Sequence, residues 1–232
     1  MSKKLQPNAI VVTMPTRGVI LTEAQNAIDR ELISVQQLPT ILRTHDLPLP
    51  LSRNFLVESA LQIPGWEYML MMDDDVIMAK GTLKEMLTMD TDIAVTNYPA
   101  HGKHQGKNVS TMLHNKDKSV VFGGLGCVLV KRTVLETIPQ PWFVVTEYRI
   151  ARDENGEVGF YAGQADGRAQ QTSAGEDTYF FLQARKHGFE IKEVSKMATH
   201  ARVDMLVTNS HTTRYHQQHV INKSNKVDIE IL

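Results

Sequence analysis

Cysteine is almost missing from this sequence of 232 residues, in which Cys127 is the only one. A single cysteine cannot form an intramolecular disulfide or build a cysteine-based metal site. Long hydrophobic runs are missing too, since no stretch approaches the roughly 20 apolar residues that span a bilayer. The apolar run at 9–12 is broken by Thr13 and Pro15 and is too short for a secretory signal. We therefore expect a soluble, cytoplasmic protein without stable membrane insertion.

An excess of charge of one sign is also missing, because the sequence contains 25 Lys and Arg residues and 26 Asp and Glu residues. The formal net charge of -1 gives no global electrostatic reason for tight binding to nucleic acid or to an anionic membrane. The chain shows neither an internal repeat nor a low-complexity tract. With 42% hydrophobic residues it can bury one sizeable core, so a single domain is expected.

Strand-like and helix-like patterns alternate along most of the chain. Short β-branched or apolar runs predict strands at 9–13, 40–43, 68–72, 93–97, 120–122, 126–130 and 191–194. A helical period of apolar residues predicts helices at 23–36, 52–61, 83–89, 132–137 and 176–187, with Ser52 as the N-cap of the second. This alternation predicts an α/β three-layer sandwich, in which helices cover both faces of a mainly parallel central sheet.

Two regions depart from the alternation. Residues 141–175 combine aromatic side chains with the turn-like 153–156 and a polar stretch rich in Gly and Gln, which predicts a hairpin and a mobile loop. Residues 204–232 are polar, and we interpret them as a solvated or dimer-forming extension. The alternative is a modest basic face for polynucleotide, formed by His211, Arg214, His216, His219, Lys223 and Lys226.

The clearest chemical signal is the apolar run 68–72, which stops at Asp73, Asp74 and Asp75. Ligands of open α/β sheets bind outside the carboxyl ends of the strands, where hard divalent cations are held by carboxylate oxygens. Asp73 and Asp75 can reach one site while Asp74 points elsewhere. Bound Mn²⁺ or Mg²⁺ would offset the charge on a departing diphosphate. The competing interpretation is a solvated acidic turn.

Further candidate residues lie on both sides of these aspartates. Glu176 and Asp177 begin a helix, where they are either caps or a general base with a neighbour that positions it. His200 is either an ordinary hydrogen-bonded histidine or a further ligand for Mn²⁺. Arg53 is either a surface residue or a clamp on phosphate. Gly124 belongs to the Gly-rich 123–126, which allows close backbone approach but contains no complete dinucleotide-binding fingerprint.

In their order along the chain, these motifs resemble the GT-A-fold glycosyltransferases, most closely the family 2 type. The resemblance covers most of residues 9–203 and rests on the ordered set rather than on one motif. The residues that carry it are Pro15-Thr16-Arg17, Ser52-Arg53-Asn54, Met72 to Val76, Gly124 to Arg132, Gly175-Glu176-Asp177 with 181–188, and His200. It implies a catalytic domain over 1–203, followed by the extension 204–232.

The resemblance also implies a metal-dependent, inverting transfer of sugar from a nucleoside-diphosphate sugar, with a UDP-sugar favoured, to an acceptor hydroxyl. Asp177 would be the base, with Glu176 beside it. The residues expected to bind the nucleotide-sugar are Pro15, Thr16, Arg17, Asp46, Arg53, Asp73, Asp74 and Gly124. Those expected to bind Mn²⁺ or Mg²⁺ are Asp75, His200 and Asp73.

Two other functional classes remain open at this point. A nucleotidyltransferase would also place a metal-binding acidic pair at a strand end, but it normally grips a triphosphate with an early basic or Gly-rich loop. Residues 16–18 (Thr-Arg-Gly) match such a loop only in part, with one basic residue and one glycine. A non-catalytic nucleotide- or glycan-binding module is the other alternative. The acceptor is a glycan, a protein, a metabolite or a hydroxylated nucleobase in DNA.

Overall fold

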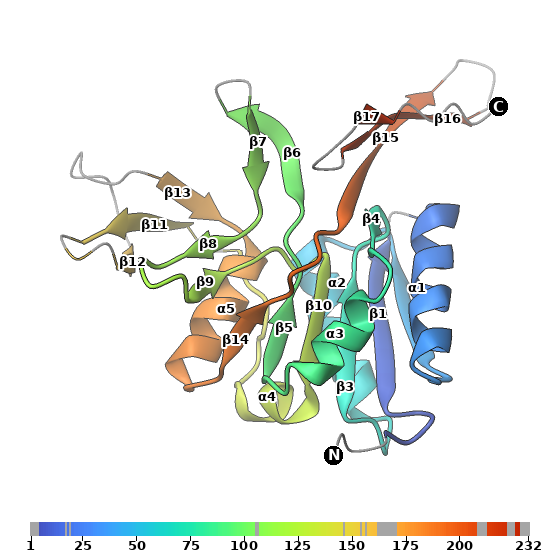
Figure 1. Cartoon of the computed structure of the whole chain (residues 1–232), viewed down its shortest axis with the longest axis horizontal. Coiled ribbons are helices and arrows are strands. Elements are labelled where there is room, and N and C mark those ends of the chain that lie inside the picture. The colour runs from blue at the N-terminus through green and yellow to red at the C-terminus, as the bar shows by residue number, and fades with distance from the viewer. Residues whose placement is uncertain are drawn as a thin grey trace.

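The structure is a computed structural model of the whole chain, shown in Figure 1. It describes residues 5–16, 18, 20–104, 107–145, 147–153, 155, 157–161, 171–207, 213–221 and 226–227. Arg17, which we expected to contact the nucleotide, lies outside the described residues. So do residues 162–170, in the part of 141–175 for which we expected a mobile loop.

The centre of the molecule is a six-stranded sheet with the strand order β14-β5-β10-β3-β1-β2. The strands are β1 (Ile10–Thr16), β2 (Thr40–His45), β3 (Tyr68–Met72), β5 (Ile93–Val95), β10 (Cys127–Lys131) and β14 (Ile191–Glu193). Within this sheet only β10 is antiparallel to its neighbours, β3 and β5. The predicted α/β class with a mainly parallel sheet is confirmed.

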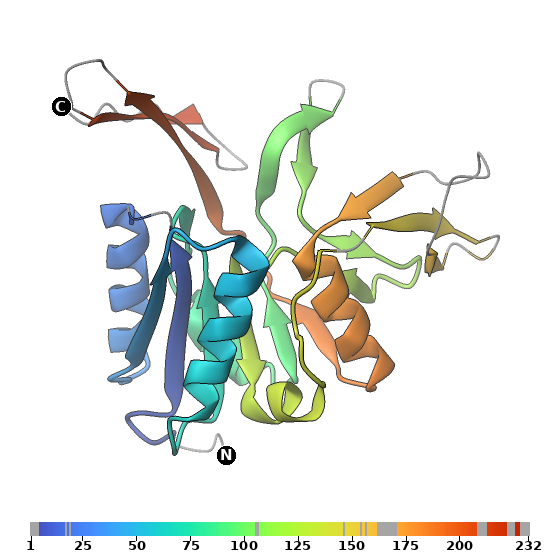
Figure 2. The same cartoon turned by 180° about the vertical axis from the view of Figure 1, so that it is seen from behind.

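Helices cover both faces of this sheet because successive side chains of its strands point to opposite faces and are apolar on both. Val11 and Met69 face α2 (Leu49–Leu61), α4 (Arg132–Thr137) and α5 (Glu176–Lys186), while Val12 and Leu70 face α1 (Thr22–Ser34) and α3 (Thr82–Thr88). Figure 1 shows α3 in front of the sheet. In Figure 2, which is seen from behind, α2 lies in front of the opposite face. None of the described helices is long and apolar enough to cross a bilayer.

Smaller antiparallel sheets surround the edge of the central sheet at which β3 ends. One contains β4 (Val76–Ile77), β15 (Thr199–Val207), β16 (Thr213–Ile221) and β17 (Lys226–Val227). Another contains β11 (Glu147–Arg152), β12 (Val158–Tyr161) and β13 (Gln171–Ala174). Two further pairs are β6 (Pro99–His104) with β7 (Lys107–Ser110), and β8 (Leu113–His114) with β9 (Val120–Phe122). In Figures 1 and 2 the β6–β7 and β15–β16 hairpins rise above that edge.

The predicted start of α2 is wrong. The helix begins at Leu49, with Pro48 at the N-cap position and Pro50 in the first turn, whereas we expected Ser52 to be the N-cap. Proline fits the first helical turn because its missing N–H would have no partner there. The hydroxyl of Ser52 instead forms a buried hydrogen bond with the hydroxyl of Thr44. Pro48 and Pro50 therefore stand at the beginning of a helix.

A buried carboxylate connects the two helices on one face of the sheet. Glu31 on α1 has a side chain that is 0% exposed, and it accepts hydrogen bonds from the backbone N–H groups of Gly81 (2.9 Å) and Leu83 (3.1 Å) at the start of α3. Arg30 pairs with the same carboxylate at 3.2 Å. Glu31 thus satisfies backbone donors that a helix N-terminus leaves without an intrahelical partner.

We predict that Glu31→Ala lowers the free energy of unfolding by about 3 kcal/mol, because two buried N–H groups lose a charged acceptor. Glu31→Gln, which keeps one carbonyl oxygen, should lose less. The measurement is urea unfolding, and Glu58→Ala on the exposed side of α2 is the control. Equal stability of the wild type and Glu31→Ala would contradict this role.

Candidate active site

The residues expected at the site meet at the carboxyl ends of three adjacent parallel strands. Pro15 and Thr16 end β1, Asp46 follows β2, and the three aspartates follow β3. The backbone N–H of Asp46 donates to the carbonyl oxygen of Thr16 over 3.2 Å, so these two nucleotide-binding candidates are neighbours. This edge of an open α/β sheet is where ligands of such folds bind.

Arg53 joins the aspartate loop to the beginning of α5. Its side chain is 4% exposed, and Nη2 donates to Oδ1 of Asp73 (2.6 Å) while Nε donates to Oε1 of Glu176 (3.3 Å). Burial alone would lower the pKa of Arg53, but the negative charges of Asp73 and Glu176 outweigh it and raise that pKa. One guanidinium therefore brings together two carboxylates that are far apart in the sequence.

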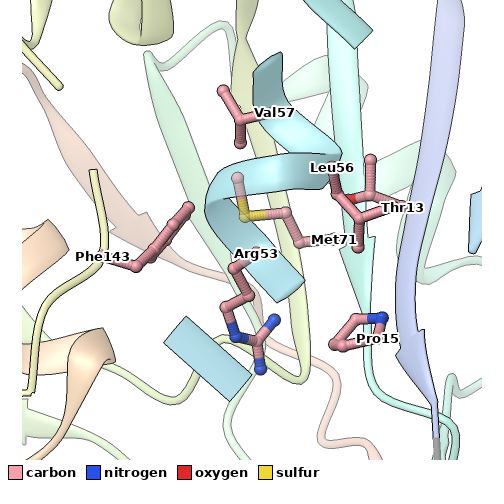
Figure 3. A pocket seen from close by; sticks show the side chains of 7 residues that line it. All are labelled: Thr13, Pro15, Arg53, Leu56, Val57, Met71 and Phe143. Atoms are coloured by element: carbon pink, nitrogen blue, oxygen red, sulfur yellow. The ribbon is translucent and has the colours of Figure 1, made fainter. Parts of the chain in front are cut away.

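Arg53 also lines a pocket beside the end of β1. The other lining residues are Thr13, Pro15, Leu56, Val57, Met71 and Phe143. In the view of Figure 3, the guanidinium lies between Phe143 and Pro15 and points away from Val57. These residues form a largely apolar lining with a buried cation at one end, and that cation already pairs with Asp73 and Glu176.

Asp75 and His200 form the second pair of the site. Nε2 of His200 lies 3.4 Å from Oδ2 of Asp75, and Nδ1 lies 2.8 Å from the carbonyl oxygen of Pro99. A carbonyl only accepts, so Nδ1 carries a hydrogen and Nε2 is the nitrogen directed at Asp75. The pKa of His200 is lowered by burial but raised more strongly by the hydrogen bond and charge of Asp75, and the net direction is upward.

The side chains of Asp75 and His200 are chemically suited to bind a divalent cation. A carboxylate oxygen and an imidazole nitrogen 3.4 Å apart are close enough to ligate one ion, and a ligating histidine usually donates its other N–H, as Nδ1 does here. Among the described residues, no three or more His, Cys, Asp or Glu side chains are placed so that they could hold a metal ion together. Oδ1 of Asp73 is engaged by Arg53. Oδ2 of Asp73, a substrate diphosphate and water could supply further ligands, and the metal role of Asp73 stays a prediction.

Asp177 occupies the second position of α5, next to Glu176. Its Oδ1 accepts a hydrogen bond from the backbone N–H of Thr178 at 2.7 Å. Burial, followed by the negative charge of Glu176, raises the pKa of Asp177 above its ordinary value. A Cβ at Gly175 would lie 2.5 Å from Oδ1 of Asp177, so the glycine leaves room for the carboxylate. An aspartate with a raised pKa is suited to accepting a proton.

Gly124 and Asp74 each have a structural role, one steric and the other through a backbone hydrogen bond. A Cβ at Gly124 would overlap the phenol oxygen of Tyr98, so the Gly-rich loop makes room for this side chain. The carbonyl of Asp74 accepts a hydrogen bond from the N–H of Leu21 over 3.3 Å, which ties the aspartate loop to the start of α1. Neither contact tests the expected nucleotide binding, which stays a prediction for both residues.

Sequence reasoning missed Tyr98 and did not assign a role to Asn54. Tyr98 stands between the aspartate loop and His200, but in the sequence it is a single aromatic residue after a strand, with no motif. The side-chain oxygen of Asn54 accepts from the N–H groups of Trp142 (2.9 Å) and Phe143 (3.2 Å), and its amide donates to the carbonyl of Phe143 (2.7 Å). It thereby fixes the segment leading into β11 against α2.

Comparison with known proteins supports the fold. The protein A197 from STIV matches with 16% identity over 93% of this chain and 98% of its own, with a TM-score of 0.54. The chain has a Rossmann-like α/β fold.

Two other solved structures match with lower TM-scores. A glycosyltransferase involved in the glycosylation of the major capsid of PBCV-1 matches with 13% identity over 57% of this chain and 68% of its own, with a TM-score of 0.33. The inositol-1-phosphate CTP transferase from T. maritima matches with 10% identity over 82% and 86%, with a TM-score of 0.45. Both are too distant to carry an argument about function. No protein-family model and no curated relative matches.

We predict that Arg53→Met lowers the free energy of unfolding by about 3 kcal/mol at pH 7, because two largely buried carboxylates lose their shared cation. Urea unfolding at pH 7 measures it. Arg43→Met, at an exposed position of β2, is the control and should change stability by less than about 0.5 kcal/mol. Equal stability of Arg53→Met and the wild type would contradict this role of Arg53.

Proposed function

We propose that this protein is a metal-dependent, inverting glycosyltransferase that moves a sugar from a nucleoside-diphosphate sugar, with a UDP-sugar favoured, to an acceptor hydroxyl. The observation that carries the proposal is the bridge by which Arg53 joins Asp73, after β3, to Glu176, beside Asp177. It unites a candidate metal loop and a candidate base in one site. The Rossmann-like fold supports it, since that edge of the sheet is the usual ligand site.

The donor is held by charge complementarity. Asp75 and His200 would hold Mn²⁺ or Mg²⁺, which, when bound, neutralises the diphosphate and stabilises it as a leaving group. We place the nucleotide part of the donor beside Pro15 and Arg53, at the carboxyl end of β1. Asp73, kept in place by Arg53, presents its second oxygen, Oδ2, to hydroxyl groups of the donor.

Asp177 acts as the general base. It takes the proton from the acceptor hydroxyl while that oxygen forms a bond to the anomeric carbon. The bond between the anomeric carbon and the diphosphate oxygen breaks at the same time, and the electron pair leaves with the nucleoside diphosphate. Attack from the opposite face inverts the anomeric centre, so that an α-linked donor gives a β-linked product. The acceptor is a glycan or a hydroxylated nucleobase in DNA, and residues 141–175 are the proposed acceptor side of the site.

The first test of the donor site is thermal stability. We predict that UDP with Mn²⁺ raises the midpoint of thermal unfolding, that neither alone does so fully, and that Asp75→Ala removes the dependence on metal. GDP, CDP and ADP, their common diphosphate sugars and the nucleoside triphosphates are measured in parallel, each with and without Mn²⁺.

The control variant is Asp29→Ala on α1, which removes an exposed carboxylate away from the candidate site. It should behave like the wild type. Stabilisation by a nucleoside triphosphate, with none by any diphosphate or diphosphate sugar, would instead favour a nucleotidyltransferase. No shift with any nucleotide would contradict the donor site.

The second test separates the base from the binding residues. Asp177→Asn should bind the donor as tightly as the wild type but release nucleoside diphosphate about 10²- to 10⁴-fold more slowly, because the base acts in the transition state. Activity of the wild type should fall on acidification at a pH above the ordinary aspartate pKa, since burial and Glu176 raise the pKa of Asp177. Steady-state kinetics from pH 4 to pH 9 measure both effects.

The stability of this variant gives an independent check. A raised pKa in the folded state means that the native protein favours protonated Asp177, and this contribution to stability is lost as the pH rises through that pKa. Asp177→Asn should therefore be at least as stable as the wild type at pH 7. Wild-type turnover by Asp177→Asn would show that the base lies elsewhere.

A further inference from the structure

Tyr98 lies at the centre of the site, and the proposed function does not yet use it. Its side chain is 4% exposed. Its phenol oxygen accepts a hydrogen bond from the backbone N–H of Gly126 at 2.8 Å, and its ring packs edge-on against His200 with 5.3 Å between the ring centroids. The negative charges of both Asp73 and Asp177 act on Tyr98. It therefore contacts one residue of the candidate metal pair and lies within electrostatic reach of the candidate base.

The hydrogen of the phenol has no acceptor within the part of the chain that the structure describes. Asp73 supplies the complementary half, because Oδ1 is bound by Arg53 whereas Oδ2 has no hydrogen-bond donor among the described residues. The two oxygens lie on the same side of the Gly126 backbone. A Cβ at Gly126 would lie 2.6 Å from the phenol oxygen of Tyr98 and 2.9 Å from Oδ2 of Asp73.

A hydroxyl group is the ligand that satisfies such a pair, since it donates one hydrogen and accepts another. It would donate to Oδ2 of Asp73 and accept from the phenol of Tyr98. A phenol has an ordinary pKa of about 10, so Tyr98 keeps its hydrogen at neutral pH. Water can fill the same position in the free protein, and a substrate hydroxyl would displace it.

We propose that Tyr98 and Oδ2 of Asp73 together bind one hydroxyl group of the nucleotide-sugar donor, which makes Tyr98 a specificity-determining residue. This inference rests on the proposed function, because it takes the donor to be a nucleotide-sugar. The hydroxyl belongs either to the ribose or to the transferred sugar, and the test distinguishes the two. A buried polar pair of this kind discriminates strongly against analogues that lack the hydroxyl, because its groups are then left unsatisfied.

The test compares the wild type with Tyr98→Phe, which keeps the ring against His200 and removes only the hydroxyl. Isothermal titration in the presence of Mn²⁺ measures binding of UDP, its 2′-deoxy and 3′-deoxy analogues, and UDP-glucose, with the base replaced if the thermal screen selects another. Tyr68→Phe, at the opposite end of β3, is the matched control and should bind every ligand like the wild type. Thermal unfolding checks that each variant is folded.

We expect Tyr98→Phe to bind about three- to tenfold more weakly, as is typical of one lost hydrogen bond. If the ribose hydroxyl is bound, the loss appears with UDP and vanishes with one deoxy analogue. If the sugar hydroxyl is bound, UDP binds equally to both proteins and only UDP-glucose binds more weakly to the variant. An equal loss for every ligand, or no loss for any, overturns the proposal and leaves Tyr98 a structural role.

The outcome remains decisive in two further cases. If Tyr98→Phe does not fold, the wild type alone is titrated with UDP, UDP-glucose and the deoxy analogues of both parts of the donor. Unchanged affinity for all deoxy analogues then overturns the proposal, and weaker binding of one supports it. If the wild type binds no nucleoside diphosphate at all, the proposed function itself fails, which differs from a wild type that binds but does not depend on Tyr98.

Discussion

The buried guanidinium of Arg53 is the contact on which the arrangement of the site depends. It holds Asp73 and Glu176 within hydrogen-bonding distance of one side chain and so fixes the loop after β3 against the start of α5. An arginine stays charged in proteins, whereas a lysine in such a place would shift its pKa. With Asp75 and Asp177 added, the carboxylates outnumber the cations among the described residues of the site. Bringing a divalent ion to this edge of the sheet would offset that repulsion.

Helix α2 is the second constraint on the site, because two of its neighbouring side chains make different contacts. Arg53 reaches the carboxylates, while Asn54 holds the backbone at Trp142 and Phe143. The direction of the helix therefore sets both the charged centre and the course of the chain toward β11. Its start at Leu49 places both residues within the first two turns, at the end of the helix that favours anions. The Gly-rich loop adds a steric constraint, since Gly124 and Gly126 leave room for Tyr98.

Much of the fold could be predicted because local patterns and tertiary structure agree there. Strand β3 is an unbroken apolar run in the sequence since both of its faces are covered, and the helical period of α1 follows from its packing on one face. The start of α2 was wrong because prolines fit a first helical turn as well as a loop. The role of Glu31 could not be predicted, since its partners are N–H groups of a helix 50 residues or more away.

Local sequence was enough to predict the α/β alternation, the acidic loop after β3 and the acidic start of α5, because each depends on neighbouring residues. Which of these side chains meet depends on how the strands and helices pack. The tertiary structure paired Asp75 with His200, placed Arg53 between two carboxylates, and set the ring of Tyr98 against His200. These contacts join residues from different strands and helices. Their distances follow from how the layers pack and not from the spacing of residues along the chain.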